Sequence, residues 1–346
     1  MERPTLDNLP GSVIEYIEYL EAELLKSKTK KDQRATSGMD DKVDLTPVDY
    51  KEPPTSFNLI TISQDGVAKR TYRHEYTRQR RGGIGVFDLE TAQNDQPVCL
   101  VNADETQTLI LFTDHAKAYR LAVTKLEARQ IRSKGEFLSS KISIPPGEAI
   151  IAALPEQATG YIALMSKSGK VRCLRHHLFG EHMKPGTAMY KFEDFGPLAS
   201  VCWTSGDSDL FVVTTNGMGI RISEKIVNPQ GTQAIKLSEP DEVVSVVSVT
   251  EEDGVLVVSA DGKGAIRLMS GFAPNKSAGG SGKIVIKSSK VIGALLAEPD
   301  ADIFVISKLS KIIRFHISDV PETTGVVQGV NCISLRADEV AAITKN

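Results

Sequence analysis

The feature that most constrains this fold is an internal repeat of about 48 residues that recurs six times from residue 57 onward. Each repeat holds an apolar run, a Ser or Thr, a turn, and a second run that closes on an arginine. The closing arginines lie 50, 52, 49, 46 and 47 residues apart, at Arg70, Arg120, Arg172, Arg221, Arg267 and Arg314. Because one unit of this size cannot bury the faces of its own sheet, neighbouring units must supply the core.

The second half of each repeat also recurs. A glycine opens a third short strand, and a polar turn then leads to a fourth. These glycines are Gly85, Gly135, Gly186, Gly231, Gly282 and Gly329. Six units of four strands predict an all-β fold, a six-bladed β-propeller over residues 57–346. The chain has no G-H…W-D pairs and one tryptophan, Trp203, which disfavours the WD40 type.

The first 56 residues have a different character. Residues 9–26 predict a short helix, with Ser12 as N-cap and Glu15 completing a capping box. Its apolar stripe covers only about two heptads, so weak dimerisation through residues 12–26, docking and a solvated helix all stay open. We therefore expect a helix region (1–30), a disordered linker (31–56) and the repeat domain (57–346). Met1 and the distinct N-terminal segment favour a whole protein over an excised domain.

Composition excludes several classes of protein. The 346 residues are 41% hydrophobic, and no apolar run nears the ~18 residues of a membrane span. Four cysteines lie far apart without a C-x-x-C pair, which indicates buried, reduced thiols in a cytoplasmic protein. The closest histidines, His176, His177 and His182, lack a metal-ligand spacing. We expect no metal, no cofactor and no membrane.

The net charge of −3 hides an uneven distribution. Residues 1–56 hold 12 acidic and 8 basic residues, a net of −4, so the other 290 carry −3 − (−4) = +1. The richest cationic stretches, 69–81 and 117–134, fall in the first two repeats. A local basic track on a nearly neutral domain is compatible with binding a polyanion.

Residues 78–85, R-Q-R-R-G-G-I-G, place the densest positive charge beside the most flexible backbone. Glycine N–H groups can approach phosphates closely while arginines neutralise them. With the run 65–77 before it, this box resembles the first blade of the C-terminal domain found in the DNA gyrase A and topoisomerase IV A family. The family's box reads Q-R-R-G-G-K-G, and six of its seven positions match, with Ile84 in place of lysine. Segments 116–135, 230–246 and 327–340 resemble other blades, so the resemblance covers about residues 57–346.

The resemblance implies a β-pinwheel, a propeller variant that binds and bends duplex DNA around a basic rim without reading bases. Double-stranded DNA is the expected first partner, and the second is the catalytic part of a type IIA topoisomerase, in the cytoplasm at the nucleoid. That catalytic part, with its winged helix and nucleophilic tyrosine, does not fit into residues 1–56. Because no other catalytic motif is found either, we interpret the chain as non-enzymatic.

The expected DNA contacts are the cations of the first three repeats and the box residues. They are Lys69, Arg70, Arg73, Arg78, Gln79, Arg80, Arg81, Gly82, Gly83, Gly85, Lys117, Arg120, Arg129, Arg132, Lys134, Lys170, Arg172 and Arg175.

Three alternatives stay open. The recurrent arginines either meet DNA or clamp adjacent blades, and the box glycines serve either phosphate or the turn itself. Ile84 either weakens wrapping by removing a cation or packs against a neighbouring blade. The competing function is a decayed pinwheel that acts as a protein-interaction scaffold, which the weakly charged loops of the later repeats support, among them N-K-S-A-G-G-S-G (275–282).

Overall fold

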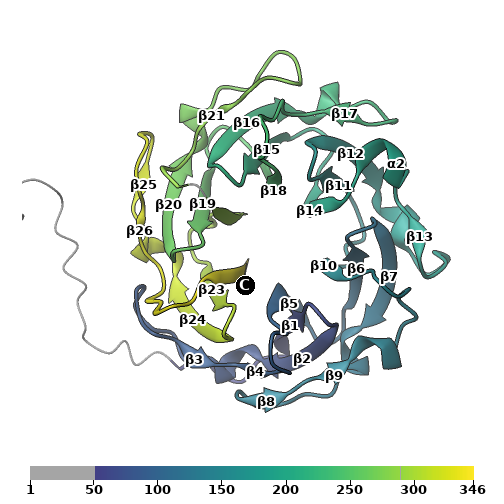
Figure 1. The fold of residues 1–346 in the computed structure, drawn as a ribbon, viewed down its shortest axis with the longest axis vertical. Helices are drawn as coiled ribbons and strands as arrows, with labels where there is room; N and C mark the ends of the chain where they lie inside the picture. The colour runs from purple at the N-terminus through teal and green to yellow at the C-terminus, as the bar shows by residue number, and fades with distance from the viewer. Residues whose placement is uncertain (1–50, 289) are drawn as a thin grey trace, which may run out of the picture. The chain divides into compact units, whose positions relative to one another are not determined.

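The computed structural model describes residues 51–288 and 290–346. Within the unit Leu45–Asn346, these residues form a ring of six β-sheets around a central axis (Figure 1). The six-bladed, all-β propeller predicted from the repeats is confirmed. The predicted helix at 9–26, its dimerisation through residues 12–26, the whole region 1–30 and the linker up to residue 50 lie outside the described residues.

Each sheet takes three antiparallel strands from one repeat, arranged from the centre outward. The innermost strands are β5 (Pro97–Asp104), β10 (Ile150–Pro155), β14 (Leu198–Thr204), β18 (Val243–Val249), β22 (Val291–Leu296) and β27 (Val340–Lys345). The second strands are β1 (Phe57–Ser63), β6 (Thr108–Thr113), β11 (Tyr161–Ser166), β15 (Asp209–Thr214), β19 (Gly254–Ser259) and β23 (Asp302–Ser307). The third strands are β2 (Val67–Tyr72), β7 (Lys117–Ala122), β12 (Lys170–Arg175), β16 (Met218–Ser223), β20 (Lys263–Leu268) and β24 (Lys311–His316).

The core lies between the blades. The second strands are buried on both faces, which explains why they read as continuous apolar runs instead of alternating ones. One cluster joins Ile60 and Ile62 of β1 to Leu109 and Leu111 of β6, and similar clusters bridge the other neighbouring sheets. Stability therefore depends on contacts between repeats.

The fourth, outermost strand of each sheet comes from the following repeat, so the sequence unit and the structural blade differ. In the first sheet Glu136 of repeat 2 pairs with Ala68, and in the last sheet Val86 of repeat 1 pairs with Ile312 and closes the ring. The exchanged strands are β3 (Val86–Phe87), β9 (Glu136–Phe137), β13 (Thr187–Ala188), β17 (Thr232–Gln233), β21 (Lys283–Ile284) and β26 (Val330–Asn331). The fifth sheet gains one more strand, β25 (Glu322–Thr323), and β4 (Leu89–Glu90) pairs with β8 (Ser133–Lys134) beside the first.

The recurrent glycine directly precedes each exchanged strand. At Gly85 φ is +73°, and a Cβ would lie 2.5 Å from the carbonyl oxygen of Ile312 on the receiving strand. The chain can make this close approach only without a side chain. The repeat-wide glycine is thus explained by strand exchange.

Short helices carry the chain between the third strand and the next inner strand. They are η1 (Arg73–Glu75), η2 (Val123–Lys125), η3 (Leu138–Ser140), η4 (His176–Phe179), α2 (Phe192–Phe195), η5 (Glu224–Ile226), η6 (Met269–Gly271) and η7 (Ile317–Asp319).

All six recurrent arginines clamp one repeat to the next, which confirms the clamping alternative. Four of them donate to the carbonyl where the next repeat's 3₁₀ helix ends. The pairs are Arg70 with Leu126 (3.2 Å), Arg120 with Phe179 (2.5 Å), Arg221 with Phe272 (3.3 Å) and Arg314 with Tyr76 (3.1 Å).

Arg172 and Arg267 clamp from a different register. The other four arginines pair with the residue three positions before the Ser or Thr that ends the second strand, as Arg70 does with Ile60. Arg172 pairs instead with Leu164, which is one position closer to that Ser or Thr, and Arg267 pairs with Val255, which is one position farther from it. Their guanidinium groups donate instead to Pro229 O (3.0 Å) and Thr324 O (2.9 Å) of the next repeat. The six arginines are therefore evenly spaced in the sequence but contact the next repeat in two different geometries.

The glycine before an exchanged strand offers a stability test. Gly66→Ala and Gly85→Ala both place an alanine at positive φ, which costs about 1–2 kcal/mol. Only Gly85 also meets neighbouring backbone, whereas a Cβ at Gly66 has open space within 4 Å. We expect Gly85→Ala to lower the free energy of unfolding by about 1–3 kcal/mol more than Gly66→Ala in urea denaturation. Equal losses would show that the exchange tolerates a side chain.

Candidate nucleic-acid interface

The box at residues 78–85 lies on the seam where the first repeat joins the last blade. Gln79 N donates to Arg314 O (2.7 Å), and Gly82 N donates to Cys332 O (2.8 Å). Gly83 O accepts a bond from Ser334 N (2.9 Å) before the chain enters β3. The box is therefore first of all the segment that closes the ring, and its glycines serve that path.

The box arginines take part in the closure. Arg78 pairs with Asp302 of the last repeat (2.8 Å), and Arg81 Nε donates to Asp319 O (2.6 Å). Arg80 is half-buried and also has an interaction within the chain. Ile84 points outward with 63% of its surface exposed, so the alternative that it packs against a neighbouring blade is wrong.

Glu52 adds a second fastening to the same seam. This residue falls inside the range assigned to the linker, yet its carboxylate pairs with Arg73 (2.5 Å) and Arg314 (2.7 Å). Burial alone would raise the pKa of Glu52, but these two arginines hold that pKa below its ordinary value. Arg73, an expected DNA contact, is thus engaged between the first and last blades.

Lys69, another expected DNA contact, is buried, and its assignment to the DNA surface is corrected. Its ammonium lies 2.5 Å from Asp88, and both side chains are fully shielded from solvent. Tyr76 and Thr61 donate hydroxyl bonds to the same carboxylate, at 2.7 and 2.9 Å. Burial lowers the pKa of Lys69 while Asp88 opposes the shift, and burial together with Asp88 raises the pKa of Tyr76.

This polar cluster is specific to the first repeat. Asp88 follows an exchanged strand, and its backbone N–H reaches Ser310 O of the last repeat at 2.8 Å. The corresponding residue is apolar in the other five repeats, which have Leu138, Met189, Ala234, Val285 and Cys332. Cations also reach this position in repeats 3 and 5, where Arg172 and Arg267 donate to the main-chain oxygens of Met189 and Val285, but a buried ion pair forms here only where the ring closes.

Several other expected contacts are also engaged inside the chain. Arg70 is almost fully buried and pairs with Glu105, while Arg120 pairs with Glu156. Lys117 pairs with Glu148, and Lys170 Nζ donates to Asp194 O at 2.5 Å. Arg70 is thus almost fully buried, whereas Arg120 and Arg172 are half-buried and hold neighbouring repeats together.

The remaining candidates lie at the surface. Arg129 pairs with Glu127 (2.8 Å), and Lys134 lies 3.6 Å from Glu90. Arg175 is exposed and stacks over Tyr161, whereas Arg132 is exposed with no side-chain partner among the described residues. Of the basic candidates, Arg132 is thus the most available to an external anion.

Ten exposed cations on the segments between blades have no side-chain partner in the described part of the chain, and of these only Arg132 is among the DNA contacts expected from the sequence. All lie in the segments that cross from one blade to the next along the circumference. They are Lys125, Arg132, Lys184, Lys191, Lys225, Lys236, Lys276, Lys283, Lys287 and Arg336. Counting charge by crossing segment, and not by density along the chain, would have found the others.

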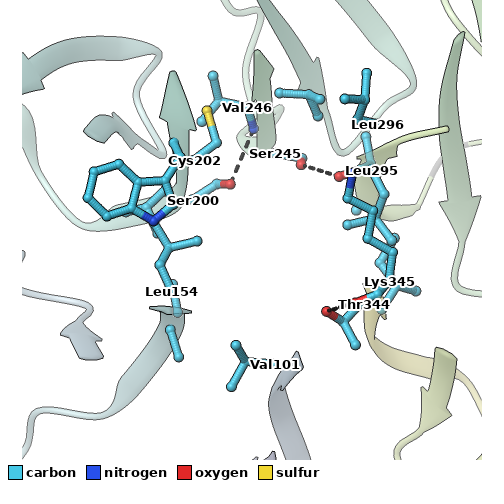
Figure 2. Close-up of a pocket in the computed structure, with 18 of the residues that line it drawn as sticks. Val101, Leu154, Ser200, Cys202, Ser245, Val246, Leu295, Leu296, Thr344 and Lys345 are labelled. Atoms are coloured by element: carbon cyan, nitrogen blue, oxygen red, sulfur yellow. Dashed lines mark hydrogen bonds between the residues drawn. The ribbon is translucent and has the colours of Figure 1, made fainter. Parts of the chain in front are cut away.

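The centre of the ring offers a different candidate site. A cavity of about 930 Å³ is lined by the six innermost strands, with aliphatic side chains such as Val101 and Leu154 pointing into it (Figure 2). Its serines are used between blades: Ser200 Oγ accepts from Val246 N (3.2 Å), and Ser245 Oγ donates to Ala294 O (3.1 Å). The lining also contains one ion pair, Lys345 with Glu298 (2.5 Å).

The cysteines have no disulfide partners. Cys99 and Cys332 are buried and Cys173 and Cys202 partly buried, and burial raises the pKa of the Cys99 thiol to about 12. Between residues 51 and 346, Ser289 apart, no three His, Cys, Asp or Glu side chains are grouped to hold a metal ion. None of the helices described in this range is long and apolar enough to span a membrane.

Comparison with known proteins gives a consistent result. A family model described as DNA gyrase C-terminal domain, beta-propeller, matches residues 58–96, 107–155, 208–250 and 301–343, about half of the chain. The gyrase A protein of Chlamydia trachomatis is 31% identical over 305 residues, and that of Kosmotoga olearia is 25% identical over 299. The matches cover 83% and 82% of this chain but only 36% and 37% of those bacterial proteins, so the chain spans about a third of their length.

Solved structures agree on the fold. The structure of a DNA gyrase A C-terminal domain aligns with a TM-score of 0.73 at 22% identity, covering 84% of this chain and 99% of that domain. The C-terminal domain of DNA topoisomerase IV aligns with a TM-score of 0.60 at 19% identity, covering 85% and 94%.

The ion pair at the seam can be tested by comparing a single with a double variant. Asp88→Asn leaves the Lys69 ammonium buried without its counter-charge, and we expect a loss of about 3–5 kcal/mol in the free energy of unfolding. Lys69→Met combined with Asp88→Asn removes the unpaired ammonium and keeps a side-chain acceptor for the hydroxyls of Tyr76 and Thr61, so it should recover most of that loss. Urea denaturation followed by circular dichroism measures both. If the double variant is as unstable as the single one, the pair is not the source of the loss.

Proposed function

The chain belongs to the DNA gyrase C-terminal domain family of β-propellers, and on this premise we propose that it binds duplex DNA and bends or wraps it around the ring's circumference without catalysing a reaction. The observation that carries the proposal is the set of exposed cations on the crossing segments, which have no partner among the described residues. A convex, positively charged rim can neutralise the phosphates of bent DNA and needs no contact to bases.

The form of the surface supports duplex over single-stranded DNA. Single-strand binding uses rows of aromatic side chains on which bases stack. Among the described residues only two aromatic side chains are exposed, Phe57 and Phe137, and they do not form a row along the rim. Lysines on short strands and loops suit a backbone-tracking contact better.

The proposal also includes a partner protein and a location in the cell. The relatives are DNA gyrase A proteins about three times as long as the matched region, so we place this chain as a non-catalytic partner of a type IIA topoisomerase. It acts in the cytoplasm, on the DNA of the nucleoid.

A protein-interaction scaffold is the second candidate. Its support is a set of apolar side chains exposed on or beside the exchanged strands: Ile84 at 63%, Phe137 at 58% and Ile284 at 49%. Such side chains, scattered along a rim, fit a weak protein contact but contribute no attraction for phosphate. The two functions therefore differ in their dependence on salt.

The linking number of circular DNA tests the proposal directly. The protein is mixed with relaxed plasmid, a nicking-closing topoisomerase is added, and the deproteinised DNA is resolved by gel electrophoresis. We expect a shift of consistent sign that grows with protein concentration and disappears at high salt, because wrapping stores a DNA crossing and depends on phosphate contacts. No shift, together with no salt-sensitive duplex binding, would leave the scaffold as the better function.

Ile84→Lys tests the contribution of the box to the rim. Because the isoleucine is largely exposed, a lysine fits without repacking and adds one cation beside the seam. We expect the slope of log affinity against log salt to steepen by about 0.9, the value for one additional phosphate contact. Ile84→Gln serves as the uncharged control, and an equal slope for both variants would place this position away from DNA.

A further inference from the structure

The fifth repeat contains a second copy of the glycine box. Residues 279–282 read G-G-S-G, and residues 82–85 read G-G-I-G. In both copies the first and last glycines adopt positive φ: +77° and +73° at Gly82 and Gly85, and +82° and +77° at Gly279 and Gly282. Both copies also end directly before an exchanged strand, β3 in one case and β21 in the other.

The backbone contacts of the two copies correspond as well. Gly279 N donates to Ala234 O (3.0 Å), as Gly82 N donates to Cys332 O, and Ala234 and Cys332 occupy the same position of their repeats. Gly280 forms a parallel bridge with Ile235, as Gly83 does with Ile333.

The side-chain amide beside the second glycine is also matched. A Cβ at Gly280 would lie 2.8 Å from Asn275 Nδ2, and one at Gly83 would lie 2.7 Å from Gln79 Oε1. Asn275 therefore takes the place of Gln79, with one extra residue before the glycines. The likeness is one of local structure and not only of four letters.

The two copies differ in how their charges are used. The first box directs Arg78 and Arg81 to acceptors of the last repeat. In the second, Lys276, Lys283 and Lys287 are exposed and have no side-chain partner among the described residues.

The crossing segment 269–290 contains no Asp or Glu. Each of the other five crossing segments contains at least three acidic residues: 73–96, 123–149, 176–197, 224–242 and 317–339. The fourth lysine of 269–290, Lys290, is engaged with Glu339. The positive potential of this segment is therefore the least compensated along the circumference.

The position of the lysines suits a phosphate track. Lys283 lies on β21, the outermost strand of the fourth sheet, at the outer edge of the ring in Figure 1. Lys276 and Lys287 flank it in the sequence, so three exposed cations follow one another on this segment. Carboxylates, which would repel a polyanion, are absent from this stretch of sequence.

From these observations we propose that the second box, residues 275–287, is the main phosphate-gripping site of the rim, with the DNA backbone as its ligand. The inference rests on the proposed DNA-binding function and assigns the two boxes different work. The first box closes the ring, and the second holds DNA. The strongest grip then lies on the fifth repeat's crossing segment and not on the first two repeats.

A matched pair of triple variants tests this assignment. One variant carries Lys276→Gln, Lys283→Gln and Lys287→Gln, and the control carries Lys184→Gln, Lys191→Gln and Lys225→Gln, which are also exposed lysines of the crossing segments. Binding to a labelled duplex of mixed sequence is measured at salt concentrations from about 50 to about 300 mM. In this range the release of counterions by phosphate contacts makes the affinity depend steeply on salt.

For the second-box variant we expect the slope of log affinity against log salt to fall by about 2.7, with affinity reduced on the order of tenfold or more, since three phosphate contacts are removed. The control should change the slope by less than about 1. Thermal unfolding should be unaltered in both, because the lysines support no internal contact. Equal slope changes in the two variants would overturn the assignment.

Failure of the proposed function is distinguishable from failure of this inference. If the wild-type chain shows no salt-dependent duplex binding at all, the DNA function itself is wrong. If the wild type binds and the second-box variant keeps its slope, DNA binding stands and the second box is not its grip.

Discussion

The exchange of one short strand between neighbouring repeats is the constraint on which the rest of this structure depends. Each sheet is completed by residues of the following repeat, and the last sheet is completed by β3 of the first. A two-residue strand supplies few hydrogen bonds, so the exchange is secured from two sides. A glycine lets the chain approach the receiving strand, and an arginine clamp holds the turn that precedes it. No blade can then form independently, which couples the stability of all six.

The joint between the last blade and the first repeat, which closes the ring, differs chemically from the other five joints. At five joints the residue after the exchanged strand is apolar, and at the seam it is Asp88 with the buried Lys69. A buried pair of this kind contributes little net stability relative to an apolar pair, because desolvation offsets most of the attraction. It does penalise a wrong partner strongly, since Asp88 in an apolar site would be an uncompensated charge. We interpret the pair as a device that specifies which strand closes the ring.

How much of the fold and of the candidate site can be predicted from the sequence depends on which physical property each sequence pattern reflects. Apolar runs and turn glycines report local backbone, so the strands and the six-fold repeat were predictable. Which sheet a two-residue strand joins depends on contacts far apart in the sequence, 136 − 68 = 68 residues for Glu136 with Ala68 and 312 − 86 = 226 for Val86 with Ile312, and no local pattern encodes it. The density of cations predicted a DNA surface at Lys69 and Arg70, but density does not report burial, and both side chains are buried on opposite faces of β2.

The same reasoning explains why the second box was interpreted from the sequence as a weakly charged loop and why Ile84 is tolerated. A motif that closes a strand exchange is defined by its glycines, and a motif that grips phosphate is defined by its exposed charge. A segment that both closes a strand exchange and grips phosphate shows the glycines and the exposed charge together. In this chain we assign the closure to repeat 1 and the exposed charge to repeat 5. The first box keeps its glycines and uses its arginines at the seam, so replacing its lysine by Ile84 leaves the closure untouched. The second box has no acidic residue to compensate its lysines, and a nearly neutral domain can still present one strongly positive edge.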